Sequence, residues 1–202
     1  MEAVRVSDLT HRFGDGEMAK PVLHGLALTV AAGEVVLLTG PSGSGKTTLL
    51  TLIGGLRAVQ EGSCTVLGTE LAGADEAMRV AVRRRVGFIF QHHNLLGFLT
   101  AQQNVAMALE VDPRLGEGER LDRAEAMLEA VGIGEKTHAY PATLSGGQRA
   151  RVALMRTLLS KPRALLLDEP FASLDVETRQ GFRKFVFDHA RAAGLPTLLV
   201  TH

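Results

Sequence analysis

A glycine-rich turn between a short apolar run and a helical segment constrains the fold of this chain most strongly. The turn reads Gly40-Pro41-Ser42-Gly43-Ser44-Gly45-Lys46-Thr47, with Thr48 directly behind it. Residues 35–39 are nearly all apolar, which predicts a buried parallel strand, and residues 47–53 predict a helix. A strand, a glycine-rich turn and a helix in this order are the setting that a phosphate-binding P-loop requires.

The residue types in this turn suit the binding of phosphate groups. Gly40, Gly43 and Gly45 allow unusual backbone dihedrals, so that several N–H groups can point to one place. The helix N-terminus adds partial positive charge there. Lys46 supplies a full charge for the outer phosphates, and the Thr47 hydroxyl can ligate Mg²⁺. We therefore expect a nucleotide site, and not a glycine-rich turn without a ligand.

A second apolar run, residues 164–167, ends in two carboxylates. Asp168 and Glu169 could simply be polar residues at a strand end. However, the carboxyl ends of parallel strands are where α/β sheets bind ligands. Beside a P-loop, Asp168 is expected to hold Mg²⁺ through water, and Glu169 to polarise the attacking water.

Composition narrows the class of protein. The chain has 202 residues, of which 46% are hydrophobic, which suits one or two globular units with a substantial core. Lys and Arg number 22, as do Asp and Glu, so zero net charge argues against a nucleic-acid-binding surface. Cys64 is the single cysteine, which excludes an intrachain disulfide. No apolar run approaches the ~20 residues of a membrane span, so a transport role would place the membrane part on another chain.

Hydrophobic periodicity predicts a single α/β domain, with residues 1–95 and 161–202 interrupted by a helical insertion over 96–160. Residues 1–32 alternate between apolar and polar side chains, which predicts antiparallel strands with one wet face. After the insertion we expect a strand, a helix and a strand, over residues 164–167, 176–192 and 197–200.

The helical insertion has recognisable helix starts. Thr100 and Gln103 have the spacing of a capping box. A second helix carries an apolar face and stops near Gly132. A third opens at Ser145 and runs to about residue 160, before Lys161-Pro162. The apolar face of the second helix consists of Leu121, Ala124, Leu128 and Val131.

Leu144-Ser145-Gly146-Gly147-Gln148 resembles the signature of ATP-binding-cassette (ABC) ATPases. Other residues resemble that family's motifs in the order the family shows them, over essentially the whole chain. They are Phe13 for the aromatic that stacks on adenine, Gln91 for the Q-loop, Asp175 for the D-loop and His202 for the switch histidine. Phe13 departs from the usual tyrosine, which keeps the stacking ring and loses a hydroxyl.

The resemblance implies a RecA-like core, an antiparallel β subdomain and a helical subdomain. It also implies a transport-coupled ATPase with ATP and Mg²⁺ as cofactors. Lys46, Glu169 and His202 would be catalytic, and Thr47, Gln91 and Asp168 would serve the metal. Two copies would dimerise head to tail, so that Ser145, Gly146, Gly147 and Gln148 cover the partner's ATP. Ser145 and Asp175 could equally be N-caps of the helices that follow them.

The segment after Gln91 bears on partners. Residues 92–99 are unusually apolar for a loop, and in the family this region receives a separate transmembrane permease. The alternative is that these residues are buried between subdomains. Adjacent His92 and His93 without further ligands are expected to be solvated, and not to form a metal site.

Residues 83–111 resemble exporter ATPases for lipoprotein release, macrolide efflux and glycolipid export. This resemblance implies lipophilic cargo and a place on the cytoplasmic face of the membrane.

Two other functional classes of ATP-binding protein remain possible alternatives. Soluble relatives in DNA repair or translation usually carry two cassettes or a very long coiled coil, and neither pattern is present here. A regulatory module that binds ATP without turnover is disfavoured by the intact Glu169. Family members usually continue well past the switch histidine, so we expect this sequence to be either a piece truncated after His202 or the product of a shortened gene.

Overall fold

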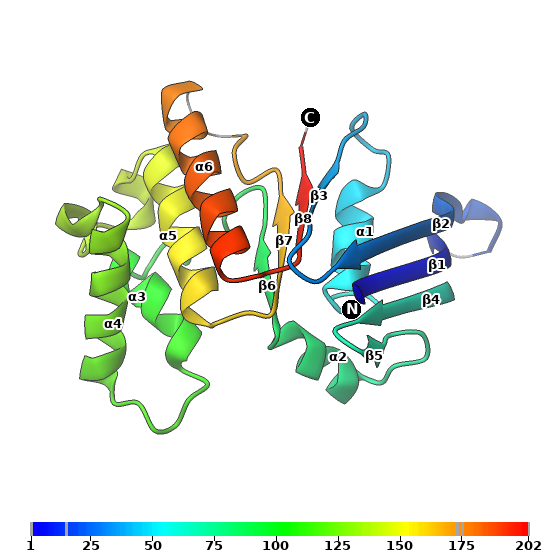
Figure 1. Cartoon of the computed structure of the whole chain (residues 1–202), viewed down its shortest axis with the longest axis horizontal. Coiled ribbons are helices and arrows are strands. Elements are labelled where there is room, and N and C mark those ends of the chain that lie inside the picture. Colours follow the sequence, from blue (N-terminus) through cyan, green and yellow to red (C-terminus); the bar gives the residue numbers. More distant parts are fainter. Residues whose placement is uncertain (1, 15, 173, 175, 202) are drawn as a thin grey trace. The chain divides into compact units, whose positions relative to one another are not determined.

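The alternating residues near the N-terminus form an antiparallel sheet. Strand β1 (Glu2–Phe13) pairs with β2 (Lys20–Ala31), and the 3-10 helix η1 (Gly16–Met18) lies between them in the chain. This confirms the antiparallel strands predicted for residues 1–32. Strands β4 (Glu61–Val66) and β5 (Thr69–Glu70) extend this sheet, in the order β2-β1-β4-β5 (Figure 1).

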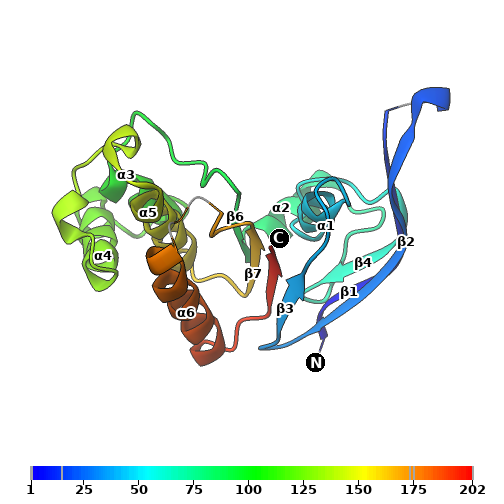
Figure 2. The same cartoon turned by 90° about the horizontal axis from the view of Figure 1, so that it is seen from above.

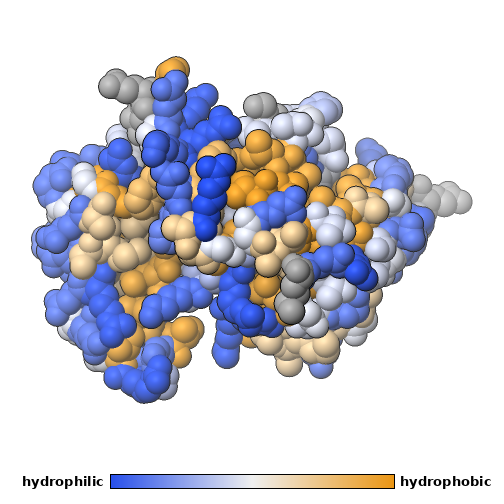
Figure 3. Space-filling view, viewed as in Figure 1, coloured by the Kyte–Doolittle hydropathy of each residue, from blue (hydrophilic) through white to orange (hydrophobic). Residues whose placement is uncertain are grey.

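A second sheet is parallel. Its order is β3-β8-β7-β6, with β8 (Thr197–Val200) paired to both β3 (Val35–Leu38) and β7 (Ala164–Asp168). β7 is buried along its whole length, as expected from its apolar sequence. β6 (Val86–Ile89) follows helix α2 (Glu76–Arg83), which the sequence did not predict. β3 forms one edge, where Leu37 is 45% exposed and hydrophobic residues gather on the surface (Figure 3).

One helix connects the cores of the two sheets. α1 (Lys46–Ile53) packs on β4 and also on β7 and β8, with Leu50, Leu52 and Ile53 fully buried. The same hydrophobic core contains Cys64 of β4. Burial, with the nearby charge of Glu70, raises the pKa of the Cys64 thiol to about 12.

The helical insertion forms a bundle. α3 (Ala101–Ala106) packs on α4 (Glu117–Ala130) and on α5 (Gly146–Leu159), and Figures 1 and 2 both show these helices side by side. Thr100 and Gln103 form the predicted capping box at the start of α3. Short 3-10 helices link the bundle: η2 (Met107–Leu109), η3 (Gly134–Lys136) and η4 (Pro141–Thr143). α6 (Val176–Ala192) has the bounds expected from its sequence.

The computed structural model describes residues 2–14, 16–172, 174 and 176–201. Internal contacts divide the chain into two units. The sheet unit comprises Met1–Phe88, Arg163–Glu169 and Phe187–His202, and the helical unit comprises Ile89–Pro162 and Pro170–Val186. Residues 89–95 and the first part of α6 thus group with the helices. Among the described residues, no helix is both long and apolar enough to cross a bilayer.

Candidate nucleotide-binding site

The glycine-rich turn has the predicted setting, since it leaves β3 at Leu38 and enters α1 at Lys46. Gly45 is the N-cap of α1 and has a left-handed backbone, with φ of 88°. A Cβ atom on Gly45 would lie 2.8 Å from Leu23 Cδ2 and 2.9 Å from the Val22 carbonyl oxygen. Both the dihedral and the close packing therefore require glycine at this position.

Lys46 lies over the turn that precedes it. Its Nζ donates hydrogen bonds to the carbonyl oxygens of Gly40, at 2.7 Å, and Pro41, at 2.8 Å. Ser44 Oγ is 3.4 Å away. The ammonium group is thus held by the loop itself, next to the backbone that would cradle phosphates.

Thr47 and Asp168 meet, although 121 residues separate them in the sequence. Thr47 Oγ1 donates to Asp168 Oδ2 at 2.8 Å, which joins the first turn of α1 to the end of β7. Asp168 is only 4% exposed, and burial raises the pKa of its carboxyl group, although the hydrogen bond from Thr47 lowers it in part. Within the described residues, Asp168 Oδ1 is buried without a hydrogen-bond partner.

This pair fits a magnesium ion. Mg²⁺ prefers hard oxygen ligands and is typically held by one or two carboxylates together with substrate phosphates. A hydroxyl beside a buried carboxylate with one unsatisfied oxygen offers such ligands next to the phosphate loop. No cluster of three or more acidic, His or Cys side chains suited to a metal occurs in the described part of the chain.

Glu169 follows the last residue of β7 and has an unusual backbone. Its φ is 46°, in the left-handed region, and its N–H donates to the Val200 carbonyl at 3.1 Å. For a residue other than glycine this conformation costs about 1–3 kcal/mol, and such residues cluster at functional sites. The sheet therefore holds Glu169 in a strained turn directly after Asp168.

Phe13 ends β1 with its ring partly exposed. The guanidinium carbon of Arg57 lies 4.8 Å from the ring centroid, and the His11 ring meets it edge-on at 5.0 Å. Burial first, and then the charge of Arg57, lowers the pKa of His11. These contacts hold a planar aromatic surface at the end of the strand.

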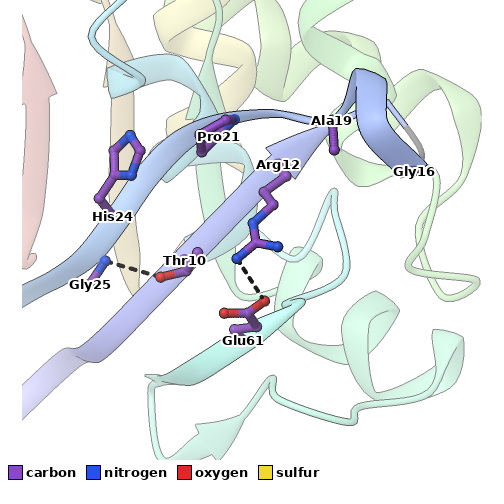
Figure 4. A pocket seen from close by; sticks show the side chains of 8 residues that line it. All are labelled: Thr10, Arg12, Gly16, Ala19, Pro21, His24, Gly25 and Glu61. Carbon is purple, nitrogen blue, oxygen red and sulfur yellow. Dashed lines mark hydrogen bonds and ion pairs between the residues drawn. The ribbon is translucent and has the colours of Figure 1, made fainter.

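A polar groove of about 520 Å³ opens on the β1–β2 hairpin (Figure 4). Arg12 and Glu61 form an ion pair across it at 3.4 Å, and Thr10 Oγ1 accepts from the Gly25 N–H at 3.0 Å. Neither Phe13 nor the phosphate loop is among the lining residues described. The groove is therefore separate from the residues expected to bind nucleotide. Its lining residues are Thr10, Arg12, Gly16, Ala19, Pro21, His24, Gly25 and Glu61.

In the helical unit, Ser145 is the N-cap of α5. Its Oγ accepts from the Gln148 N–H at 3.2 Å, and Gln148 Oε1 accepts from the Ser145 N–H at 2.9 Å. The N-cap interpretation of Ser145 is therefore confirmed. The capping role of Gln148 was missed, although its spacing of three residues from Ser145 is the usual signal. Ser145 itself is exposed at the helix N-terminus.

The loop after Gln91 is only partly exposed. Gln91 and His92 are exposed, and Phe98 is 75% exposed, whereas His93 is 3% exposed. The expectation that both histidines are solvated is wrong for His93. Arg156 of α5 donates to the carbonyl oxygens of His93 and Asn94, both at 2.9 Å, and so draws this segment onto the helices.

Asn104 forms hydrogen bonds to the backbone of the later part of that loop, residues 96–100. It is fully buried, and its side chain accepts from the Leu96 N–H and donates to the carbonyl oxygens of Leu96, Leu99 and Thr100. Sequence reasoning missed both Arg156 and Asn104, because their partners are backbone groups and leave no pattern. Two predicted site residues, Asp175 and His202, lie outside the described residues.

A family model described as ABC transporter matches residues 23–172. The chain is 42% identical over 201 residues to the methionine import ATP-binding protein MetN of Rhizobium johnstonii, covering all of this chain and 54% of that relative. It thus spans about half the length of the MetN relatives. It is also 42% identical over 196 residues to the lipoprotein-releasing system ATP-binding protein LolD of Pseudomonas fluorescens, covering 96% of this chain and 86% of that protein.

A solved structure shares the fold closely. It is a dimeric, post-hydrolysis state of the ATP-binding cassette MJ0796 bound to ADP and Pi, with a TM-score of 0.91 and 33% identity. The match covers 98% of this chain and 88% of that one. The arrangement of a parallel sheet, an antiparallel sheet and helices is therefore that of solved ATP-binding cassettes.

Proposed function

Because the chain belongs to the ABC transporter family, we propose that it binds ATP and hydrolyses it to ADP and phosphate to power transport. The observation that carries the proposal is the hydrogen bond of 2.8 Å between Thr47 and Asp168 beside the phosphate loop. It joins a hydroxyl and a buried carboxylate at the point where Lys46 and the helix N-terminus provide positive charge. Phosphate-binding and metal-binding groups thus converge.

The family resemblance gives each residue of the proposed site a role. The backbone of residues 40–48 and Lys46 bind the phosphates, and Phe13 stacks on the adenine. Thr47, Asp168 and Gln91 hold Mg²⁺, which when bound neutralises charge on the phosphates. Glu169 orients and polarises the attacking water, and His202 contacts the γ-phosphate. Catalysis in such a site is mostly positioning and charge neutralisation.

The second half of the site comes from another copy of the chain. Ser145, Gly146 and Gly147 begin the 14-residue helix α5, whose N-terminus favours an anion. Ser145 is exposed there and can face a partner's γ-phosphate. The family resemblance assigns Asp175, as a D-loop residue, to the same interface. The MJ0796 cassette was solved as a dimer bound to ADP and Pi, which supports a dimer of this chain. The head-to-tail arrangement follows from the family resemblance.

A separate transmembrane permease is the proposed partner, docking on residues 91–99. The 75% exposed Phe98 beside the half-buried Leu95, Leu96 and Leu99 supports a hydrophobic contact there. Export of lipophilic cargo is the finer proposal, supported by the identity to a lipoprotein-releasing ATPase. The equal identity to a methionine importer supports uptake as the second candidate.

Replacing Glu169 tests the proposed hydrolysis. Glu169→Gln keeps the size of the side chain and removes its basicity, so hydrolysis should fall by about 10²- to 10⁴-fold while ATP binding persists. The mutant should then accumulate as an ATP-bound dimer, seen by size-exclusion chromatography with Mg·ATP.

Glu129→Gln, at an exposed position on α4, is the matched control and should hydrolyse ATP normally. Hydrolysis by Glu169→Gln near the wild-type rate would refute the role given to Glu169. A wild-type full-length protein that binds ATP without turnover would instead favour the regulatory module.

A further inference from the structure

We propose that Gln60 is a positioning residue for the base of the nucleotide, because its side chain fixes the strand end that presents Phe13. The proposal rests on the proposed stacking of adenine on Phe13. Gln60 lies in the segment between α1 and β4, directly before the first residue of β4. It matches no motif that the sequence resemblance supplied.

Gln60 makes a two-point contact with the backbone of Arg12. Its Oε1 accepts from the Arg12 N–H at 2.7 Å, and its Nε2 donates to the Arg12 carbonyl oxygen at 3.1 Å. A carboxamide has one donor side and one acceptor side, so it satisfies both backbone groups of one residue in the way a neighbouring strand would. Gln60 therefore replaces a strand at this position.

The sheet needs this replacement because β4 stops short of Phe13. The last residue pair between β1 and β4 is Thr10 with Glu61, two residues before Arg12. On the opposite side, β2 continues to the end of β1, where Phe13 pairs with Lys20. Without Gln60, the end of β1 would be held from one side only, and strand ends with unpaired backbone groups fray.

The same segment also touches the ring of Phe13. Arg57 lies three residues before Gln60, and its guanidinium group lies over the Phe13 ring at 4.8 Å. Both residues follow α1, whose first residue is Lys46 of the phosphate loop. Gln60 lies beyond the end of α1, and its two hydrogen bonds go to the backbone of Arg12 beside Phe13. A change at Gln60 should therefore alter binding of the base more than binding of the phosphates.

The experiment compares ATP with tripolyphosphate, which has the phosphates without the base, on the full-length protein with Mg²⁺ by calorimetry. Stacking of a base on an aromatic side chain is worth ~1–3 kcal/mol, so Phe13→Ala should weaken ATP binding about 5- to 150-fold. Gln60→Ala should weaken ATP binding by a smaller factor, roughly 3- to 10-fold, within the same stacking contribution. Tripolyphosphate should bind all variants alike.

Two further variants separate positioning from a general structural effect. Glu61→Ala removes the ion pair with the Arg12 side chain but not the Gln60 contact, and should leave both affinities unchanged. In a Phe13→Ala background, Gln60→Ala should have no additional effect, because the two act through one contact.

The outcomes are distinguishable. If Phe13→Ala leaves the preference for ATP over tripolyphosphate unchanged, the adenine role of Phe13 fails, and the positioning role fails with it. If Phe13→Ala lowers that preference but Gln60→Ala does not, only the positioning role is overturned. Equal loss of ATP and tripolyphosphate binding in Gln60→Ala would likewise overturn it, since a structural defect acts on both ligands.

Discussion

Glu70 is a single side chain that stabilises the antiparallel sheet. It accepts four hydrogen bonds, from the Ser63 and Thr65 hydroxyls and from the Cys64 and Ala72 N–H groups. Burial alone would raise its pKa, but these hydrogen bonds outweigh burial and lower the pKa to about 2 from 4.5. A lowered carboxyl pKa gives stability that is present above the unfolded value and is lost as the pH falls from about 4.5 to about 2.

Glu70→Gln should therefore lower the free energy of unfolding at pH 7 by about 1–3 kcal/mol, the usual range for hydrogen bonds to a charged group. The difference from wild type should shrink at pH 3, measured by urea unfolding at both pH values. The exposed Glu61→Gln is the control and should change stability by less than about 1 kcal/mol. A difference of equal size at both pH values would show that the charge of Glu70 is irrelevant.

At the level of helices and loops, α5 fixes the conformation of the segment after Gln91. His93 and Asn94 have left-handed backbones, with φ of 63° and 46°, and their carbonyl oxygens both accept from Arg156. Arg156→Lys keeps the charge but loses the planar fork that binds two acceptors at once. We expect faster hydrogen exchange over residues 91–99 and little change in α5 itself. Arg151→Lys on the same helix is the control, and equal exchange in both variants would contradict this role.

For the whole molecule, the proposed dimer predicts complementation between two inactive variants. Lys46→Ala disables the phosphate side of a site, and Ser145→Arg places a bulky cation at the N-terminus of α5. A mixed dimer has one site with both changes and one intact site. Mixing should restore up to about a quarter of wild-type activity, since half of the dimers are mixed and each holds one intact site.

The complementation assay should be accompanied by nucleotide-dependent crosslinking. If hydrolysis requires two intact sites, the mixed dimer would form and still show no ATPase activity. A crosslinked mixed dimer that forms only with ATP supports the shared site even then. Full activity of Ser145→Arg alone, in a protein that stays monomeric at every ATP concentration, would refute the model.

Local patterns in the sequence predicted the elements that hold the site. The strand, turn and helix around Gly45, the capping box at Thr100 and the bounds of α6 and β8 were all predictable, because each depends on neighbouring residues. The pairing of β4 with β1 was not, since register between distant strands leaves no local signal. The burial of His93 and the contact of Gln60 with Arg12 were missed for the same reason. Both features arise from contacts between segments that are distant in the sequence and meet only in the folded chain.

The buried thiol of Cys64 has a practical consequence. It is the only cysteine in the chain, is fully buried, and has a pKa near 12, so at neutral pH it carries almost no reactive thiolate. A protein of this sequence is therefore suited to site-directed labelling without prior removal of Cys64. A cysteine introduced at Ser145 or Phe98, both exposed, would be the one site that a spin label or fluorophore modifies. In the proposed dimer, distances between labels on the two copies would then show whether ATP draws them together.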